Sequence, residues 1–560
     1  MSDNSATPTT NASALTASIR LPGVWMMFAL AVAALVLVPV AVTFSAFFSR
    51  SEGDVLAHMA EFVLPELLVN TLWLLLGVGV GVSVLGVTLA WLVAMCEFPG
   101  RRLFDWALLL PLALPAYVTA FVAIGLLDYT GPLQSWLRET WLRDILLLGG
   151  MPEIRSRGGV ILVMSLALYP YVYLIAKNAF ATQGAIALEA AQSLGLSRTQ
   201  GFFRVALPMA RPWIAAGLML ALMETLADFG TMAIFNYDTF TTAIYKAWYS
   251  LFSLPAAAQL ASILILFVLV AVVFEQRSRI QMRYGAVGRS AASRRIRLTP
   301  LQAGLATLYA ASVLALAFII PVTQLALWTS DVIATDLDSR YWGFAWHSVL
   351  LAGIGALLVT GVALLLAYAG RRRPGPAIMW LQRLATIGYA FPGAVLAVGL
   401  FIPVAWLDNW LIDTGRAWFG FDGSEILKGT LLVMLLAYLV RFLAVGFGPI
   451  DSGLQRITRN VDEAARNLGT GSAGLLARVH LPMLRASLLT AAALAFVDIM
   501  KEMPITLMTR PFGWDTLAVR IFEMTSEGEW ERAALPSLAL VIAGIIPVIL
   551  LTRRGAQYHG

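Results

Sequence analysis

Apolar runs of about twenty residues recur along the whole chain, and this feature constrains the fold more than any other. Each run is long enough to cross roughly 30 Å of hydrocarbon as a helix. Only 13% of the 560 residues are charged, whereas a soluble domain carries about 25%. The sequence therefore predicts an all-α polytopic membrane protein and excludes a soluble fold.

The apolar runs predict about twelve transmembrane helices. The first run, residues 21–48, is too long for the core of a signal peptide, so we expect it to remain as a helix. The other expected spans lie near residues 66–96, 103–128, 159–180, 212–235, 257–275, 303–328, 345–370, 378–405, 427–447, 487–508 and 535–552.

The loops between these spans alternate in charge. Arginines gather in every second loop, for example in residues 371–373 and 553–554, and the positive-inside rule assigns these loops and both termini to the cytoplasm. The intervening loops are mixed or acidic, and we expect those with Asp336 and Glu529 to face outward. They either receive a partner protein or are solvated loops without a partner. Because the basic residues sit in short loops rather than on one face of a domain, the net charge of +6 does not indicate a nucleic-acid partner.

One polar segment occurs twice in the chain. Residues 189–195 (EAAQSLG) match residues 463–469 (EAARNLG), and the match continues without a gap to two Leu-Pro-Met segments. Chance similarity between Ala- and Leu-rich stretches does not explain matches at charged, glycine and proline positions. The repeat predicts two homologous six-helix halves, residues 21–276 and 300–553, with a basic cytoplasmic linker at 277–299 and cytoplasmic tails at 1–20 and 554–560.

Both copies of this loop are too polar to span a membrane. Each predicts a short helix, a break at Gly195 or Gly469 in the left-handed conformation, and a second short helix. Pro208 and Pro482 then start or kink the helix that enters the membrane, which ties the loop rigidly to that helix. An ordinary amphipathic surface helix would explain one copy, but two copies favour a paired docking device that transmits a push.

Glu-Ala-Ala, three residues, Gly and a later Leu-Pro-Met resemble the cytoplasmic loop of binding-protein-dependent ABC importer permeases, and the resemblance covers nearly the whole chain. The strings LADFGTMAIF and VDIMKEMPITLMTRPFGWDTLA look most like ferric-iron permeases of the fused two-half type, to which thiamine permeases are near relatives. The resemblance implies a type I importer fold in a bacterial inner membrane. The residues it implies for coupling to an ATPase are Glu189, Ala190, Ala191, Gly195, Leu207, Pro208, Glu463, Ala464, Ala465, Gly469, Leu481 and Pro482.

The resemblance also implies partners. These are two copies of a separate ABC ATPase, which uses the ATP, and a periplasmic or lipid-anchored iron-binding protein. The second loop has Thr470-Gly471-Ser472 where the first has Leu196-Ser197-Arg198. This difference leaves open that the two loops bind their ATPases with unequal strength.

The chain lacks the sequence of an ATP site. A P-loop needs the dipeptide Gly-Lys, and no lysine of the chain follows a glycine. An ion-coupled secondary transporter is the alternative from another class, and the paired loop decides against it. No HExxH or GxSxG motif occurs, and the single Cys96 excludes an internal disulfide and a thiolate zinc site, so we expect neither enzymatic activity nor a bound cofactor.

Five charged residues fall deep inside expected spans. Glu224 and Asp228 are four residues apart and should share one helical face, while Asp498, Lys501 and Glu502 occupy the matching helix, where Lys501 can pair with Asp498. Charges at this depth cost at least about 2.5 kcal/mol each, so they should face the bundle interior. They either line or gate a translocation path or pair with each other across the two halves.

The four carboxylates suit a hard cation such as Fe³⁺, which prefers oxygen ligands. A tight site would retain the ion, so we expect a transient path and no stable metal site. Thiamine or another small cation would suit the same charges, and only the second-half string favours iron.

Overall fold

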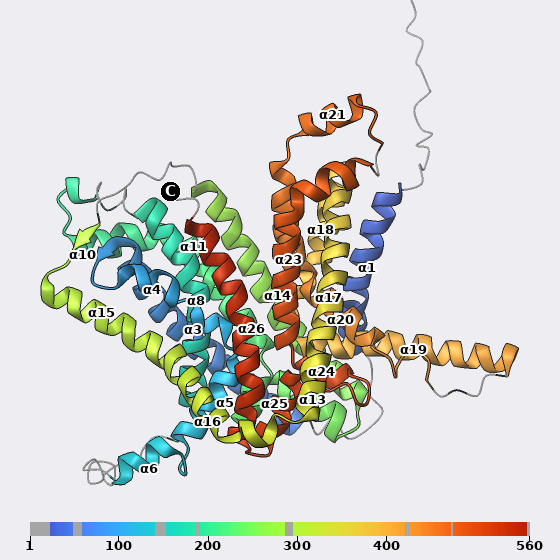
Figure 1. The fold of residues 1–560 in the computed structure, drawn as a ribbon, viewed down its shortest axis with the longest axis horizontal. Coiled ribbons are helices and arrows are strands. Elements are labelled where there is room, and N and C mark those ends of the chain that lie inside the picture. Colours follow the sequence, from blue (N-terminus) through green and yellow to red (C-terminus); the bar gives the residue numbers. More distant parts are fainter. Residues whose placement is uncertain are drawn as a thin grey trace, which may run out of the picture.

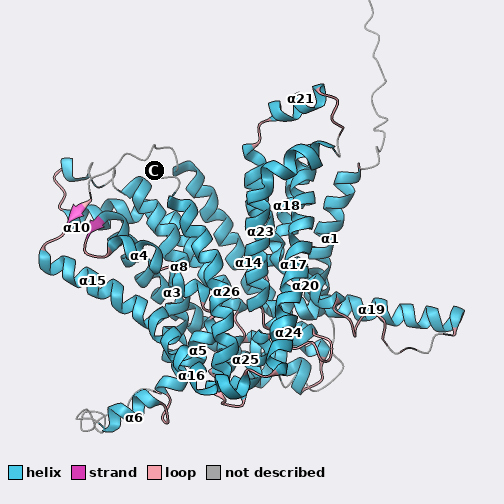
Figure 2. Ribbon diagram, in the orientation of Figure 1, coloured by secondary structure: helices cyan, strands magenta, loops and turns pink. Residues whose placement is uncertain are grey.

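A computed structural model describes residues 23–48, 59–139, 153–184, 188, 191–285, 295–420, 423, 425–471 and 474–556. Helices make up nearly all of the described chain, which confirms the all-α prediction (Figure 2). The strand pairing in these ranges is a two-residue parallel bridge between β1 (Cys96–Glu97) and β2 (Ile296–Arg297). This bridge places the start of the second half beside the end of a first-half helix.

The first half holds α1 (Val24–Ser45), η1 (Ala46–Phe48), η2 (Met59–Val63), α3 (Leu64–Met95), α4 (Arg101–Ala107), η3 (Leu110–Ala113), α5 (Ala116–Leu127), α6 (Pro132–Glu139), α8 (Arg157–Ala179), η4 (Phe180–Gly184), α10 (Arg198–Gly201), η5 (Phe202–Ala206), α11 (Leu207–Ala227), α12 (Gly230–Ile234), α13 (Phe240–Tyr245), η6 (Lys246–Ser250) and α14 (Leu254–Gly285). The second half holds α15 (Pro300–Leu314), η7 (Ala315–Ile319), α16 (Ile320–Asp336), α17 (Ser339–Arg372), α18 (Pro376–Thr386), η8 (Ile387–Ala390), α19 (Gly393–Phe419), α20 (Leu432–Arg456), α21 (Arg459–Asn467), η9 (Leu475–His480), α23 (Leu481–Lys501), α24 (Pro504–Thr509), α25 (Leu517–Ser526) and α26 (Trp530–Ala556).

Eleven helical stretches in the described ranges are long and apolar enough to cross a membrane. The twelfth expected span, residues 535–552, lies within α26. The chain is thus a multi-pass membrane protein, as the apolar runs predict.

Four of the expected spans are wrong as single helices: 212–235 and 487–508 break after α11 (Leu207–Ala227) and α23 (Leu481–Lys501). The other two are 103–128 and 378–405. Each contains a short helix, one turn of 3₁₀ helix and a break before a second helix. The break falls at Pro115 and Pro392, which cap α5 and α19 with nearly identical backbone angles (φ −56° for both, ψ 140° and 145°). Proline forces the residue before it into an extended conformation, so the helix cannot continue through these positions.

The two halves repeat one packing pattern. Helix α3 packs against α8 and α11, and α17 packs in the same way against α20 and α23. The first helices cross over: α1 packs on α17, α18 and α19 of the second half, while α15 packs on α4 and α16 on α5 of the first half. Each half therefore completes its packing with a helix from the other.

The ends of the molecule differ in what they carry. Helices α10 and α21 and the end of α26 lie at one end, and α6, α16 and α25 lie at the other (Figure 1). Both copies of the repeated loop therefore open on the same side, as the predicted topology requires.

Candidate functional site: a central polar cavity and two repeated loops

Both halves break the same helix at a carboxylate. Helix α11 ends at Ala227 and α23 at Lys501, and the next residues, Asp228 and Glu502, have extended backbone angles. Asp228 Oδ1 accepts a hydrogen bond from the Thr231 N–H (2.7 Å), and Glu502 Oε1 accepts one from the Ile505 N–H (3.1 Å). Asp228 therefore lies at the end of α11 and not within a continuous helix, and Asp228 and Glu502 each accept from an N–H in the first turn of the short helix that follows the break.

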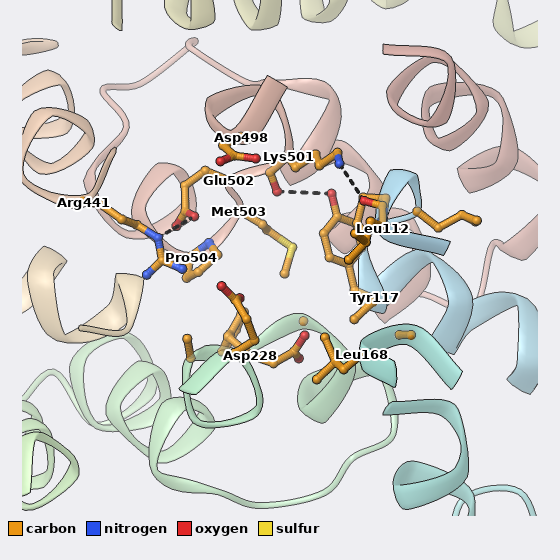
Figure 3. A pocket seen from close by; sticks show the side chains of 18 of the residues that line it. Leu112, Tyr117, Leu168, Asp228, Arg441, Asp498, Lys501, Glu502, Met503 and Pro504 are labelled. Atoms are coloured by element: carbon orange, nitrogen blue, oxygen red, sulfur yellow. Dashed lines mark hydrogen bonds and ion pairs between the residues drawn. The ribbon is translucent and has the colours of Figure 1, made fainter. Parts of the chain in front are cut away.

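A cavity of about 200 Å³ lies between the halves at these breaks (Figure 3). All five charged residues singled out in the sequence line it, which confirms that they face the interior and meet at one place. The other lining residues are Leu112, Leu114, Pro115, Ala116, Tyr117, Ala167, Leu168, Tyr171, Ala227, Phe229, Gly230, Tyr389, Arg441, Phe442, Met503 and Pro504.

Glu502 pairs with a cation that the sequence reasoning missed. Arg441 of α20 places Nε 3.2 Å from Glu502 Oε2, and both side chains are buried. Its Nη1 also donates to the Phe391 carbonyl oxygen (2.9 Å), just before the α19 break. The sequence did contain a signal for this pair: Arg441 is a single arginine in the apolar run 427–447, and a charge inside the membrane needs a partner.

The expected pairing of Lys501 with Asp498 is wrong. Lys501 Nζ instead donates to the Leu112 carbonyl oxygen of η3 (3.1 Å), in the first half. The reciprocal contact runs from the Tyr389 hydroxyl of η8 in the second half to Glu224 Oε1 in the first (3.1 Å). A third hydrogen bond runs from the Tyr117 hydroxyl of α5 to the Lys501 carbonyl oxygen (3.5 Å). The halves are thus joined here by three hydrogen bonds rather than by ion pairs between the charged residues of this cavity.

The lining is rich in oxygen atoms beyond the carboxylates. Tyr117, Tyr171 and Tyr389 add three phenol groups to Glu224, Asp228, Asp498 and Glu502. No residue pattern marked these tyrosines in the sequence, because they come from three separate elements that only the fold brings together.

The repeated loops adopt the expected helix–glycine–helix form. Gly195 and Gly469 have φ values of +87° and +81°, and nothing lies within 4 Å of where a side chain would begin. In each loop the glycine N–H bonds the carbonyl three residues back, and the next N–H bonds the carbonyl five residues back. This double bond pattern is the Schellman motif, so left-handed backbone is the reason for glycine at both positions.

Leucines stand exposed beside both glycines. Leu194 is 83% and Leu468 is 86% exposed, whereas Ala191 and Ala465 face inward. Glu463 and Ala464 are exposed, and Glu189 and Ala190 lie outside the described residues. The same position at the tip of both loops therefore presents an apolar side chain to solvent.

The loops continue directly into the membrane helices. Leu207-Pro208 begin α11 and Leu481-Pro482 begin α23, and each pair follows one turn of π helix, η5 or η9. Proline cannot donate to the helix ladder, and the wider turn accommodates the loss without a break. The predicted direct connection between each loop and its span is confirmed, and its rigidity stays a prediction.

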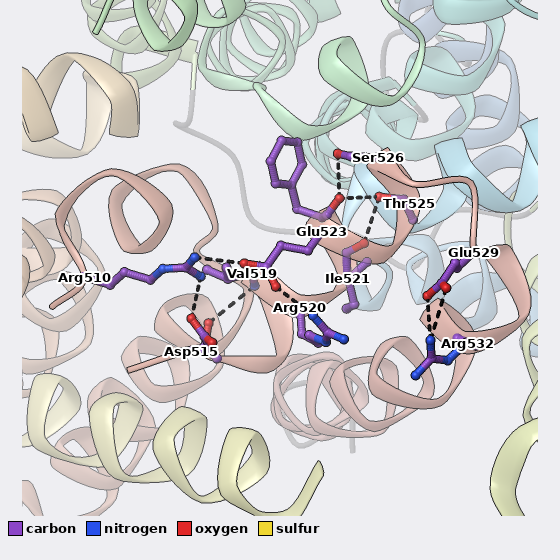
Figure 4. A network of polar contacts seen from close by, with 12 residues as sticks. Arg510, Asp515, Val519, Arg520, Ile521, Glu523, Thr525, Ser526, Glu529 and Arg532 are labelled. Atoms are coloured by element: carbon purple, nitrogen blue, oxygen red, sulfur yellow. Dashed lines mark hydrogen bonds and ion pairs between the residues drawn. The ribbon is translucent and has the colours of Figure 1, made fainter. Parts of the chain in front are cut away.

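The opposite end of the molecule carries a network of ion pairs (Figure 4). Arg532 bonds Asp336 (2.7 Å) and Glu529 (2.9 Å), and Arg510 and Arg520 share Glu523 (2.8 and 3.0 Å). Three of the acidic side chains behind the expected receptive outer surface, Asp336, Glu523 and Glu529, are therefore paired with arginines of the chain itself.

The family model described as the binding-protein-dependent transport system inner membrane component matches residues 84–280 and 359–554. The chain belongs to this family. As a binding-protein-dependent transport system inner membrane component it is an ABC importer permease, a transport component without enzymatic activity, whose family works with ATPase and solute-binding partners. The double match agrees with the two halves read from the repeat.

Known relatives support this placement. The Fe(3+)-transport system permease protein FbpB 2 of Haemophilus influenzae is 26% identical over 501 residues, which is 88% of this chain and 90% of the relative. The ferric transport system permease protein FbpB of Actinobacillus pleuropneumoniae is 23% identical over 78% of this chain and 63% of its own length. The sulfate transport system permease protein CysT of Escherichia coli is 27% identical over only 33% of this chain and 65% of its own length.

Proposed function

We propose that the chain forms the membrane channel through which ferric iron is imported from an external binding protein. The observation that carries the proposal is the oxygen-lined cavity at the meeting point of the halves. Relatives named for ferric iron match over most of the chain, whereas the sulfate permease matches over a third of it, which supports iron over an oxyanion.

The chemistry of the lining suits a hard cation. Four carboxylates face two cationic side chains, Arg441 and Lys501, so the lining carries an excess of acidic groups. Carboxylate and phenol oxygens are ligands that Fe³⁺ prefers. In the described residues no three His, Cys, Asp or Glu side chains are grouped to hold a metal ion, so iron would pass along successive oxygens. Thiamine or another small cation is the alternative substrate.

An uptake measurement tests the substrate. Proteoliposomes that contain the chain, its ATPase and its binding protein are expected to take up radioactive iron in an ATP-dependent manner, with little uptake of labelled thiamine. Thiamine uptake without iron uptake would replace iron with thiamine as the substrate. Uptake of both only after an ion gradient is imposed, without ATP, would favour secondary transport.

We also propose that two copies of a separate ATPase dock on the loops around Gly195 and Gly469. Both loops open at the end of the molecule where α26 ends, and from the arginine-rich loops we assign this end to the cytoplasmic side of the inner membrane. Each loop offers an exposed leucine on a rigidly placed turn, and each continues into a helix that ends at the central cavity. A push on the loop would therefore reach Asp228 or Glu502 along one helix.

Replacing Glu224 with glutamine is expected to slow iron transport by about tenfold or more, without loss of assembled protein. Glutamine keeps the oxygen that accepts from Tyr389 but removes the charge. The matched control is Tyr389→Phe, which removes the same hydrogen bond and keeps the carboxylate. If Tyr389→Phe slows transport as much as Glu224→Gln does, Glu224 holds the halves together and does not act on the moving ion.

A further inference from the structure

The second repeated loop is held by one arginine that uses every donor it has. Arg371, at the end of α17, donates from Nε to Asp462 Oδ2 (2.9 Å) and from one terminal nitrogen to Asp462 Oδ1 (2.7 Å). It also donates to three carbonyl oxygens at the end of α20 and the start of the loop, those of Leu454, Ile457 and Thr458. A guanidinium has five N–H donors, so this site is fully satisfied.

A histidine completes the arrangement. His480, the last residue before α23, is fully buried and lies with Nε2 2.9 Å from Asp462 Oδ1. Because the carboxylate can only accept, Nε2 carries the hydrogen. Burial alone would raise the pKa of Asp462, but the hydrogen bonds from Arg371 and His480 outweigh it and hold that pKa below the usual value. Asp462 thus ties α21 to both α17 and α23.

The first loop lacks these groups at the matching places. Leu188 stands where the second loop has Asp462, and Ala206 stands where it has His480. Helix α3 ends in Val-Ala-Met, whereas α17 ends in Gly-Arg-Arg. Leu188 is buried, and its methyl group lies against Gly201 of α10, so apolar packing holds this part of the described first loop.

We propose that Asp462, Arg371 and His480 form a clamp that makes the second loop a stiff lever, and that the first loop, whose sequence does not repeat these side chains, has no such clamp. The two ATPase contacts would then be mechanically unequal, and most of the push would enter through α21 and α23. This inference rests on the proposed docking of the ATPase, but the clamp itself can be tested without any partner.

Hydrogen exchange of the full-length permease in nanodiscs tests the clamp. Asp462→Asn is expected to speed exchange of the α21 amides by about tenfold or more, with α20, α23 and residues 191–201 unchanged. The control is Asp451→Asn, a carboxylate on α20 that bonds Gln455 within its own helix. Unchanged α21 exchange in Asp462→Asn would overturn the clamp.

The ratio of iron moved to ATP hydrolysed in the full complex tests whether the two loops contribute unequally to coupling. Iron moved per ATP hydrolysed is expected to fall severalfold in Asp462→Asn and to stay near normal in Leu188→Ala, which loosens the first loop instead. A second variant, Arg371→Met/Asp462→Leu/His480→Ala, copies the apolar first loop and is expected to keep the fold while losing coupling. If Asp462→Asn and Leu188→Ala lower the iron moved per ATP by the same factor, the two loops are not mechanically unequal and the proposal is overturned. Failure of wild-type ATPase to bind either loop would instead refute the docking proposal and leave the exchange result standing.

Discussion

The Leu194→Asp/Leu468→Asp variant is expected to lose binding of the ATPase by roughly a thousandfold and to transport nothing. Truncating an apolar anchor at the centre of an interface costs about 2 kcal/mol or more, and two sites together cost about 4 kcal/mol. Both leucines are more than 80% exposed in the chain alone, so the membrane-embedded fold should be unaffected. The measurement is co-purification of the ATPase, with uptake assayed in parallel.

Leu251→Asp is the matched control for that variant. Leu251 is also exposed, at 53%, but it lies in the turn before α14, away from the repeated loops. It should leave ATPase binding unchanged. If the double variant still recovers the ATPase at wild-type amounts, the exposed leucines are ordinary surface residues and the docking surface lies elsewhere.

Arg441→Met is expected to destabilise the protein by about 3–5 kcal/mol, because it leaves the buried carboxylate of Glu502 without its cation. The yield of folded protein and its thermal unfolding temperature should both fall. In Arg441→Met/Glu502→Gln much of the stability should return, since the amide oxygen can still accept from the Ile505 N–H that begins α24. Size-exclusion profiles and thermal unfolding in detergent provide the measurement.

Arg416→Met controls for the loss of any arginine. Arg416 pairs with Asp413 at 3.9 Å, and both side chains are mostly exposed, so this pair should contribute at most about 1 kcal/mol. If Arg441→Met is as stable as this control, water reaches Glu502, and the ion pair of Arg441 with Glu502 does not hold the cavity together.

The topology and the two halves could be predicted because they depend on long patterns. A run of twenty apolar residues or a repeated loop predicts the same structure whatever segments pack against it in the fold. The turns of the two repeated loops could be predicted for a similar reason, since the left-handed turn at Gly195 and Gly469 is a local property of the backbone.

The geometry of the cavity could not be predicted in the same way. The break after Ala227 lies inside a run that reads as continuous, and its local signals, Gly230 and the matching Pro504, come after the carboxylates. The neighbours of Lys501 and Glu224 are Leu112 and Tyr389, which belong to the other half. Spacing within one helix suggested Lys501 with Asp498, but contacts between distant segments decided the pairing.

The crossing of the first helices has a consequence for biosynthesis. Helix α1 leaves the ribosome early, yet its neighbours α17, α18 and α19 follow only after some three hundred further residues have been made. At about 5–20 residues per second, α1 must wait on the order of half a minute in the bilayer before these surfaces exist. Residues 24–48 contain no charged side chain, so α1 can wait there without exposing one to lipid. In the first half alone α1 has α14 as a packing partner. A ribosome that stalls in the linker would therefore release a bundle in which the faces of α1 that meet α17, α18 and α19 stay uncovered, for quality-control proteases to recognise.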